Sequence, residues 1–173
     1  MPARKAATPM RFGLIGCGRI SQTHLQALEV LKDLCRLEAV VDTREEAATS
    51  VANQYGCKAY TDYRRLLDGD QVDAVIVSTP PNTHAEIATY FLENKKPVLC
   101  EKPLATSVDD ARRMVQTAAE NDVLLMMASK YRYVADTIKA KGIVESGILG
   151  EIILFENVFC GKVDMRDRWN ASK

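Results

Sequence analysis

The sequence lacks an excess of charge of either sign, and it lacks long apolar runs. Its 173 residues carry 23 basic and 23 acidic side chains, whereas nucleic-acid-binding modules show a basic excess or patch. The longest apolar stretches, such as residues 123–128, are far shorter than the ~20 residues that span a bilayer as a helix. We therefore expect neither nucleic acid nor a membrane as a partner.

Paired or closely spaced cysteines are also missing. The five cysteines are odd in number, widely spaced and never arranged as Cys-x-x-Cys, which argues against a disulfide framework or a zinc site. We expect no bound metal and reduced thiols, which are typical of the cytoplasm. Residues 1–9 contain no apolar stretch of the kind found in a signal peptide, so the sequence predicts a cytoplasmic protein with a short disordered tail.

The sequence does contain an ordinary apolar fraction, 47%, in short runs that alternate with helical patterns. The runs that predict strands lie at residues 10–15, 37–41, 58–60, 72–77, 97–100 and 123–127. The patterns that predict helices lie at residues 20–31, 44–54, 62–67, 85–93, 108–121 and 134–146. Strands that alternate with crossover helices predict an α/β fold with a doubly wound parallel sheet.

Some finer features can be predicted as well. We expect Ile20, Ala27, Leu28 and Leu31 to form the buried face of the first helix. Thr61 is the expected N-cap of the short helix over 62–67, and Ser107 that of the helix over 108–121. A final β-rich run covers residues 151–160.

The loop after the first strand reads GCGRIS, residues 16–21. A GxGxx-small pattern between a strand and a helix is typical of a dinucleotide-binding loop. Gly16 permits a tight turn, Gly18 lets a pyrophosphate approach the backbone, and the helix N-terminus favours the negative charge. We therefore assign Gly16, Gly18, Arg19 and Ile20 to cofactor binding. The competing interpretation is a plain glycine-rich turn.

Asp42 ends the second strand, a little over 20 residues beyond the glycines. A carboxylate at that place binds the adenosine ribose of NAD and repels the 2′-phosphate of NADP. Arg44 is close enough to accommodate that phosphate instead, so both cofactors stay open, and we favour NAD. Asp42 is also a good N-cap for the helix that follows.

Two further loops carry polar groups at strand ends. The loop over 78–84 reads STPPNTH, and Ser78, Thr79, Pro80 and Asn82 are its candidates for the cofactor groove. His84 fits a structural role and a functional role equally well. His24, on the first helix, is better interpreted as a packed and hydrogen-bonded side chain than as a catalyst.

The loop after the fifth strand reads Glu101-Lys102-Pro103. Partial desolvation at a strand end would make Lys102 a proton donor or a group that polarises a carbonyl. The alternative is a solvated Glu–Lys pair that precedes a loop.

Together these motifs resemble the glucose–fructose oxidoreductase/inositol dehydrogenase (Gfo/Idh/MocA) family. The resemblance runs from about Arg11 to Lys173 and rests on GLIGCGRI, Asp42, the TDY sequence at residues 61–63, STPPNTH, CEKPLA and KYRY. The CEKPLA segment, residues 100–105, is its most specific element.

The resemblance implies a Rossmann fold and NAD(P)-dependent oxidation or reduction of a sugar, cyclitol or related small molecule. It implies that Lys102 is catalytic, that Glu101 and the loop over 78–84 contact the cofactor, and that Arg132 approaches the nicotinamide or the substrate. It also implies a cis peptide bond before Pro103.

The family pattern further implies a second domain that is mainly an antiparallel sheet. We expect a Rossmann domain over residues 10–130, and over 131–173 a linker helix and the first strand of an incomplete second domain. A homo-oligomer would form through that sheet. Two alternatives stay open, a non-catalytic NAD-binding or regulatory module and an NAD-assisted glycosidase.

Overall fold

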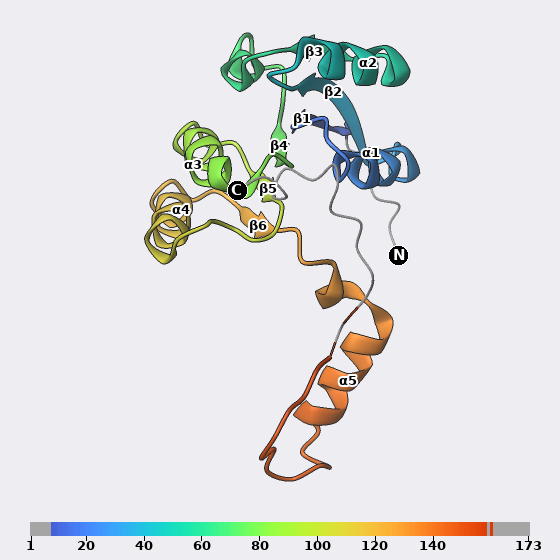
Figure 1. Ribbon diagram of the computed structural model, residues 1–173, viewed down its shortest axis with the longest axis vertical. Coiled ribbons are helices and arrows are strands. Elements are labelled where there is room, and N and C mark those ends of the chain that lie inside the picture. The colour runs from blue at the N-terminus through green and yellow to red at the C-terminus, as the bar shows by residue number, and fades with distance from the viewer. Residues whose placement is uncertain (1–7, 159, 161–173) are drawn as a thin grey trace. The chain divides into compact units, whose positions relative to one another are not determined.

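The computed structural model describes residues 8–158 and 160 of the chain. The chain divides into two compact units, Met1–Ala128 and Ser129–Lys173. Figure 1 shows the first unit as a layered α/β structure and the second as a long helix with an extended segment. Across the described ranges, none of the helices combines the length and the apolar character needed to span a membrane.

The first unit is built on a parallel sheet of six strands in the order β3-β2-β1-β4-β5-β6. This architecture confirms the predicted doubly wound α/β fold. The strands are β1 (Met10–Ile15), β2 (Cys35–Val41), β3 (Lys58–Tyr60), β4 (Ala74–Val77), β5 (Val98–Cys100) and β6 (Leu125–Met127). The four helices between them are α1 (Ser21–Val30), α2 (Glu45–Tyr55), α3 (His84–Glu93) and α4 (Val108–Glu120).

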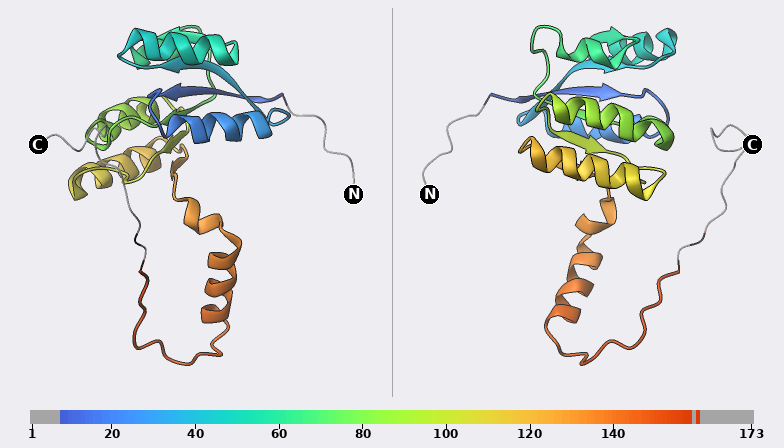
Figure 2. Two further views of the ribbon diagram at one scale, coloured as in Figure 1. Left: turned by 45° about the vertical axis from the view of Figure 1, so that its right-hand side comes forward. Right: turned by 90° about the vertical axis from the view of Figure 1, so that its left-hand side faces the viewer.

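Helices cover both faces of the sheet, with α1 and α2 on one side and α3 and α4 on the other (Figures 1 and 2). Successive strand residues point to opposite faces, and the two cores follow that alternation. Leu14 and Ile76 pack in the core that contains Leu25 of α1. Ile15, Val75 and Val77 belong to the core that contains Phe91 of α3. Because both faces are covered, the central strands are apolar throughout.

The strands are in register at their carboxyl ends. Ile15 pairs with Val41 and with Val77, Val41 pairs with Tyr60, Val77 with Cys100, and Cys100 with Met127. The residues that follow therefore form a row along this edge of the sheet, which we call the carboxyl edge. That row consists of Gly16, Asp42, Thr61, Ser78, Glu101 and Ala128. Every loop that was assigned to a cofactor from the sequence starts in it.

The order of the strands creates a switch point at this edge. The chain leaves β1 toward β2 and β3, and it leaves β4 toward β5 and β6, while β1 and β4 lie side by side. The loops after β1 and β4 therefore diverge, and open α/β sheets bind their ligands in the crevice between such loops.

Two details of the first unit differ from the sequence prediction. Helix α1 buries Ser21, Leu25 and Leu28, so only Leu28 of the predicted face is buried. Ile20 and Leu31 flank the short helix and are 41% and 46% exposed, and Ala27 is exposed because it lies off the stripe that Leu25 and Leu28 form. The N-cap of the short helix η1 (Tyr63–Leu67) is Asp62 rather than Thr61, because the helix begins one residue later and the Asp62 carboxylate accepts from the Arg64 N–H. Ser107 caps α4 as predicted, accepting from the Asp110 N–H.

The second unit contains the short helix η3 (Lys130–Tyr133) and α5 (Ala135–Glu145). The described residues of the run predicted as β-rich, 151–158 and 160, form no strand, so that expectation is not met. A strand needs a hydrogen-bonded neighbour, and none of the described residues pairs with this run. Its apolar side chains are solvent-exposed, for instance Ile153 at 94% and Phe155 at 80%. Residues 1–7 of the predicted tail, residue 159 and residues 161–173 lie outside the described residues.

Candidate functional site

The glycine-rich loop and the loop after β4 touch at Gly16. A Cβ atom at this position would lie 2.8 Å from the Ser78 carbonyl carbon and 2.9 Å from the Thr79 nitrogen, and the φ angle of Gly16 is +95°. Both the conformation and the close approach require glycine here. The Ser78 hydroxyl reinforces the contact, since it lies 2.8 Å from the Gly16 carbonyl oxygen and 3.1 Å from that of Ile15.

Gly18 faces open space and precedes a free helix end. A Cβ atom at Gly18 would meet no atom within 4 Å, so a ligand can approach the backbone closely. Helix α1 begins at Ser21 with no side-chain cap and no acidic residue in its first turn. The Ser21 and Thr23 N–H groups donate to the Gly18 and Ile20 carbonyl oxygens at 3.2 and 3.1 Å, and the helix dipole favours an anion at this end. The loop therefore fits a pyrophosphate.

Asp42 lies at the end of β2, beside the glycine-rich loop. Its Oδ2 accepts from the Cys17 backbone N–H at 2.9 Å, and its Oδ1 accepts from the Arg44 backbone N–H at 2.9 Å. The Arg44 guanidinium also forms an ion pair with Oδ1, at 3.3 Å. A carboxylate has about four lone-pair sites, so Asp42 can accept from ribose hydroxyls as well. Asp42 and Arg44 thus lie at one place, as the sequence predicted, and they are paired with each other.

The loop after β4 is held mainly by its own threonines. The Thr83 hydroxyl lies 2.7 Å from the Thr79 hydroxyl and 2.8 Å from the Pro80 carbonyl oxygen. Pro80 and Asn82 are exposed, whereas Ser78 is buried. The Ser78 side chain is therefore occupied by the glycine-rich loop. Pro80 and Asn82 are therefore open to a ligand, and Thr79 is partly exposed.

The turn after β5 begins at Glu101 and contacts helix α1, which belongs to the other half of the sheet. Glu101 is 9% exposed. Its Oε1 lies 3.0 Å from His24 Nε2 on α1, and its Oε2 accepts from the Lys102 backbone N–H at 3.0 Å. Lys102 is exposed, so the partial desolvation expected of it is not present in this structure. The Lys102–Pro103 peptide bond is cis, as the resemblance implies.

His84 is fully buried at the first position of α3. Its Nδ1 lies 2.9 Å from the Pro103 carbonyl oxygen, and its Nε2 lies 2.9 Å from the Thr79 carbonyl oxygen. Both ring nitrogens therefore have protein partners, and no part of the side chain is accessible to a ligand.

The remaining predicted site residues are Arg19, Ile20 and Arg132. Arg19 and Ile20 are exposed beside the glycine-rich loop, and Arg132 is exposed in the second unit. Among residues 8–158 and 160, no group of three or more His, Cys, Asp or Glu side chains is arranged to hold a metal.

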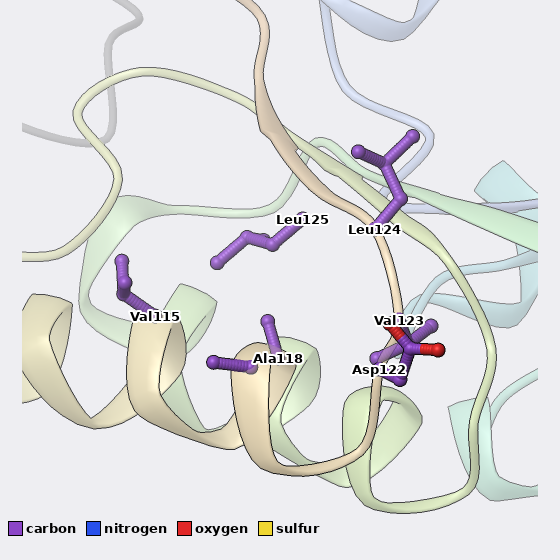
Figure 3. A pocket seen from close by; sticks show the side chains of 7 residues that line it. Val115, Ala118, Asp122, Val123, Leu124 and Leu125 are labelled. Atoms are coloured by element: carbon purple, nitrogen blue, oxygen red, sulfur yellow. The ribbon is translucent and has the colours of Figure 1, made fainter.

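An apolar groove lies between α4 and β6 (Figure 3). It is at the start of β6, so it belongs to the opposite edge of the sheet and has no part in this site. Its lining residues are Val115, Ala118, Ala119, Asp122, Val123, Leu124 and Leu125.

Sequence reasoning missed the contacts that tie these loops together. The partners in the His24–Glu101 contact are 77 residues apart, and those in the Ser78–Gly16 contact are 62 apart. No local pattern carries such information. The one available signal for His24 was its position on the helix that the glycine-rich loop opens, since that helix begins at the carboxyl edge.

Comparison with known proteins agrees with this geometry. A model of the oxidoreductase family with an NAD-binding Rossmann fold, GFO_IDH_MocA, matches residues 10–129. The chain is 36% identical over 143 residues to the myo-inositol 2-dehydrogenase of Thermotoga maritima, and the alignment covers 82% of this chain and 42% of that protein.

Solved structures show the same similarity. The WlbA dehydrogenase from Bordetella pertussis, in complex with NADH and UDP-GlcNAcA, superposes with a TM-score of 0.79 at 32% identity, over 82% of this chain and 41% of that one. KijD10, a 3-ketoreductase from Actinomadura kijaniata in complex with NADP and TDP-benzene, superposes with a TM-score of 0.75 at 33% identity, over 83% and 44%. The chain therefore spans less than half the length of the relatives it matches.

Proposed function

Because the chain belongs to the oxidoreductase family with an NAD-binding Rossmann fold, Gfo/Idh/MocA, we propose that its carboxyl edge binds a nicotinamide dinucleotide. The reaction is hydride transfer to or from a hydroxyl or keto carbon of a sugar, a cyclitol or a related small molecule. The observation that carries the proposal is the start of α1, which has no side-chain cap and follows the open space at Gly18, together with the Asp42 carboxylate on the Cys17 N–H of the same loop.

Each half of the sheet has its own part in this proposal. The loops after β1 and β2 hold the adenosine half, with Gly16, Gly18, Arg19 and Ile20 along the pyrophosphate and Asp42 on the ribose. The loops after β4 and β5 lie beyond the switch point and face the nicotinamide half. Their candidates are Thr79, Pro80, Asn82, Glu101 and Lys102.

Lys102 is the residue that we assign to proton transfer. The nicotinamide, when bound, supplies the hydride chemistry. The exposed ammonium of Lys102 lies on a turn whose backbone is held by the Glu101 carboxylate, so its stem can reach a substrate oxygen from a fixed origin. An ammonium there donates a proton to a developing alkoxide or polarises a carbonyl. Arg132 is a further candidate for contact with the nicotinamide or the substrate.

We propose NAD as the preferred cofactor, because the Asp42 carboxylate would meet a 2′-phosphate with like charge. Arg44 weakens the expected preference for NAD. Its guanidinium pairs with Asp42 at 3.3 Å, and the exposed side chain can turn toward a 2′-phosphate instead. The relatives include complexes with NADH and with NADP, so the family accommodates both.

The substrate class is drawn from the relatives, which act on inositol or are bound to nucleotide sugars. A cytoplasmic location is part of the proposal and rests on the five cysteines, all of which are unpaired. A homo-oligomer that uses the second unit remains a prediction.

Titration of the protein with NADH, followed by nicotinamide fluorescence, tests the proposal. We expect saturable binding, tighter than that of NADPH. Gly18→Val is the matched control, because its Cβ meets no protein atom and yet fills the space of the pyrophosphate. It should keep the melting temperature and lose the binding. Absence of NADH binding to the wild-type chain at millimolar concentration would exclude a competent dinucleotide site.

A non-catalytic NAD-binding module is the second candidate, because no described residue after Ala128 is buried and none builds a substrate wall. The two candidates differ in turnover. Reduction of NAD⁺ in the presence of myo-inositol or a nucleotide sugar, and its loss in Lys102→Met, would support the oxidoreductase. Tight NADH binding without turnover, for the full chain that carries these residues, would support the module.

A further inference from the structure

The two histidines of this chain meet the same short turn from opposite sides. His24 on α1 contacts the side chain of Glu101, and His84 on α3 contacts the carbonyl oxygen of Pro103. The residue between those two contacts is Lys102. The sequence contains no other histidine, so every imidazole in the chain is used within one residue of the proposed proton donor.

We propose that His84 is a positioning residue for Lys102, which it holds in place by tying the turn after β5 to the loop after β4. This inference rests on the proposed function, because it concerns the nicotinamide half of the dinucleotide site. His84 itself does not touch the cofactor, since its side chain is fully buried.

The hydrogen bonds of His84 support a clamp rather than simple core packing. Both of its partners, the carbonyl oxygens of Thr79 and Pro103, can only accept, and each lies 2.9 Å from a ring nitrogen. A neutral imidazole donates one hydrogen bond, and an imidazolium donates two. The ring therefore donates to one of the two carbonyl oxygens when neutral and to both when protonated, and it contacts two loops that are 24 residues apart in the chain. A buried carbonyl left without a donor costs free energy, so the bridge keeps both loops in place.

The titratable groups on the elements next to His84 have other partners or environments. Glu101 on the turn is engaged with His24, and Glu86 on α3 accepts from the Tyr63 hydroxyl. On α4, Asp110 pairs with Arg113. Cys100 at the end of β5 is a thiol whose pKa burial raises to about 12. Among the described residues, no charged side chain forms a hydrogen bond with His84.

His24 supplies the second support of the same turn. It comes from the helix that starts at the glycine-rich loop, so the Glu101–His24 contact, 3.0 Å long and largely buried, joins the two halves of the site. Glu101 also accepts from the Lys102 backbone N–H. The backbone of Lys102 is therefore fixed on one side by an acid that His24 holds and on the other by a carbonyl that His84 holds.

The test compares two ligands that share one half of the site. ADP-ribose occupies only the adenosine and pyrophosphate side, whereas NADH also needs the loops after β4 and β5. In His84→Ala we expect the dissociation constant of NADH to rise roughly tenfold, the size of one lost buried hydrogen bond, and that of ADP-ribose to stay within about twofold. His84→Gln, whose amide still donates, should recover part of the NADH affinity. Calorimetry on the full chain measures both ligands.

Each other outcome is informative. A residue needed only for folding would lower both affinities together or lower the melting temperature without the split, and either result would overturn the inference. So would misfolding of both His84→Ala and His84→Gln, which would assign the ring to the core. Unchanged NADH affinity in both folded variants would overturn it as well. If the wild-type chain binds neither ligand, the proposed function fails first, and the two failures are distinguishable.

Discussion

The two edges of the same parallel sheet use polar residues in opposite ways. At the amino edge, where the strands begin, Arg11 pairs with Asp73 at 2.7 Å and Lys96 pairs with Asp70 at 2.6 Å. Each of these charged side chains is paired with one of opposite sign. At the carboxyl edge the polar side chains bind mostly backbone atoms, as Asp42 does with the N–H of Cys17.

This difference bears on the proposed site. At the amino edge each of these charged groups is already paired with one of opposite sign. Bonds to backbone atoms at the carboxyl edge shape the loops and leave the start of α1 and the space at Gly18 open. Substitutions at each edge test this contrast.

Gly16→Ala should cause the largest loss, about 3 kcal/mol of unfolding free energy, because strain at positive φ adds to overpacking against the loop after β4. Gly56 is the matched control. Its φ of +66° is also positive, but a Cβ there meets nothing within 4 Å. Gly56→Ala should cost only about 1 kcal/mol. Urea unfolding of both variants gives the comparison, and equal losses would contradict the close approach.

Asp42→Asn should change the choice of cofactor. We expect NADH affinity to fall about tenfold, or about 1.4 kcal/mol, and NADPH affinity to rise, because the variant removes the charge that repels a 2′-phosphate and releases Arg44. Fluorescence titration with both cofactors measures the ratio. Asp73→Asn, at the amino edge, should leave the ratio unchanged.

Asp73→Asn should instead change the pH dependence of stability. Hydrogen bonds from Arg11 lower the pKa of Asp73 to about 2. A carboxyl with a depressed pKa stabilises the fold above its unfolded pKa of about 4, and this contribution disappears as the pH falls from about 4 to about 2. Because Asp73 is partly exposed and screened, we expect about 1 kcal/mol. Urea midpoints between pH 7 and pH 2 should fall less steeply in the variant than in the wild type.

Lys96→Met should have the smallest effect. Lys96 lowers the pKa of Asp70 through a hydrogen bond and its charge, but Asp70 is exposed, so solvent screens the pair. We expect a slight drop in the urea midpoint that vanishes near 1 M salt and no change in NADH affinity. A loss of NADH binding would show that the amino edge contributes to the site.

Most of the sheet could be predicted from local sequence, because buried parallel strands are continuous apolar runs. The strands end where polar or glycine residues begin, so Gly16, Asp42, Ser78 and Glu101 were recognisable as the start of functional loops. The run over 151–160 shows the limit of this reasoning. Its composition is that of a strand, but its described residues form none, because strand formation depends on a neighbour.

The role of each side chain within the candidate site was harder to predict. Ser78 and His84 were both candidates for contact with the cofactor, and in the structure both side chains are buried and bonded to carbonyl oxygens of other loops. Sequence spacing places a residue at the end of a strand. It does not say whether its side chain turns toward the ligand or toward the next loop.

Local sequence was enough to predict the fold class, the class of cofactor, and the carboxyl edge as the candidate site. These depend on local patterns, namely apolar periodicity and a glycine-rich turn between a strand and a helix. The contacts of His24 and His84 with the turn that carries Lys102 became visible only in the folded structure. Those contacts span 77 and 19 residues, and they exist because the strand order brings the loops of separate strands to one edge.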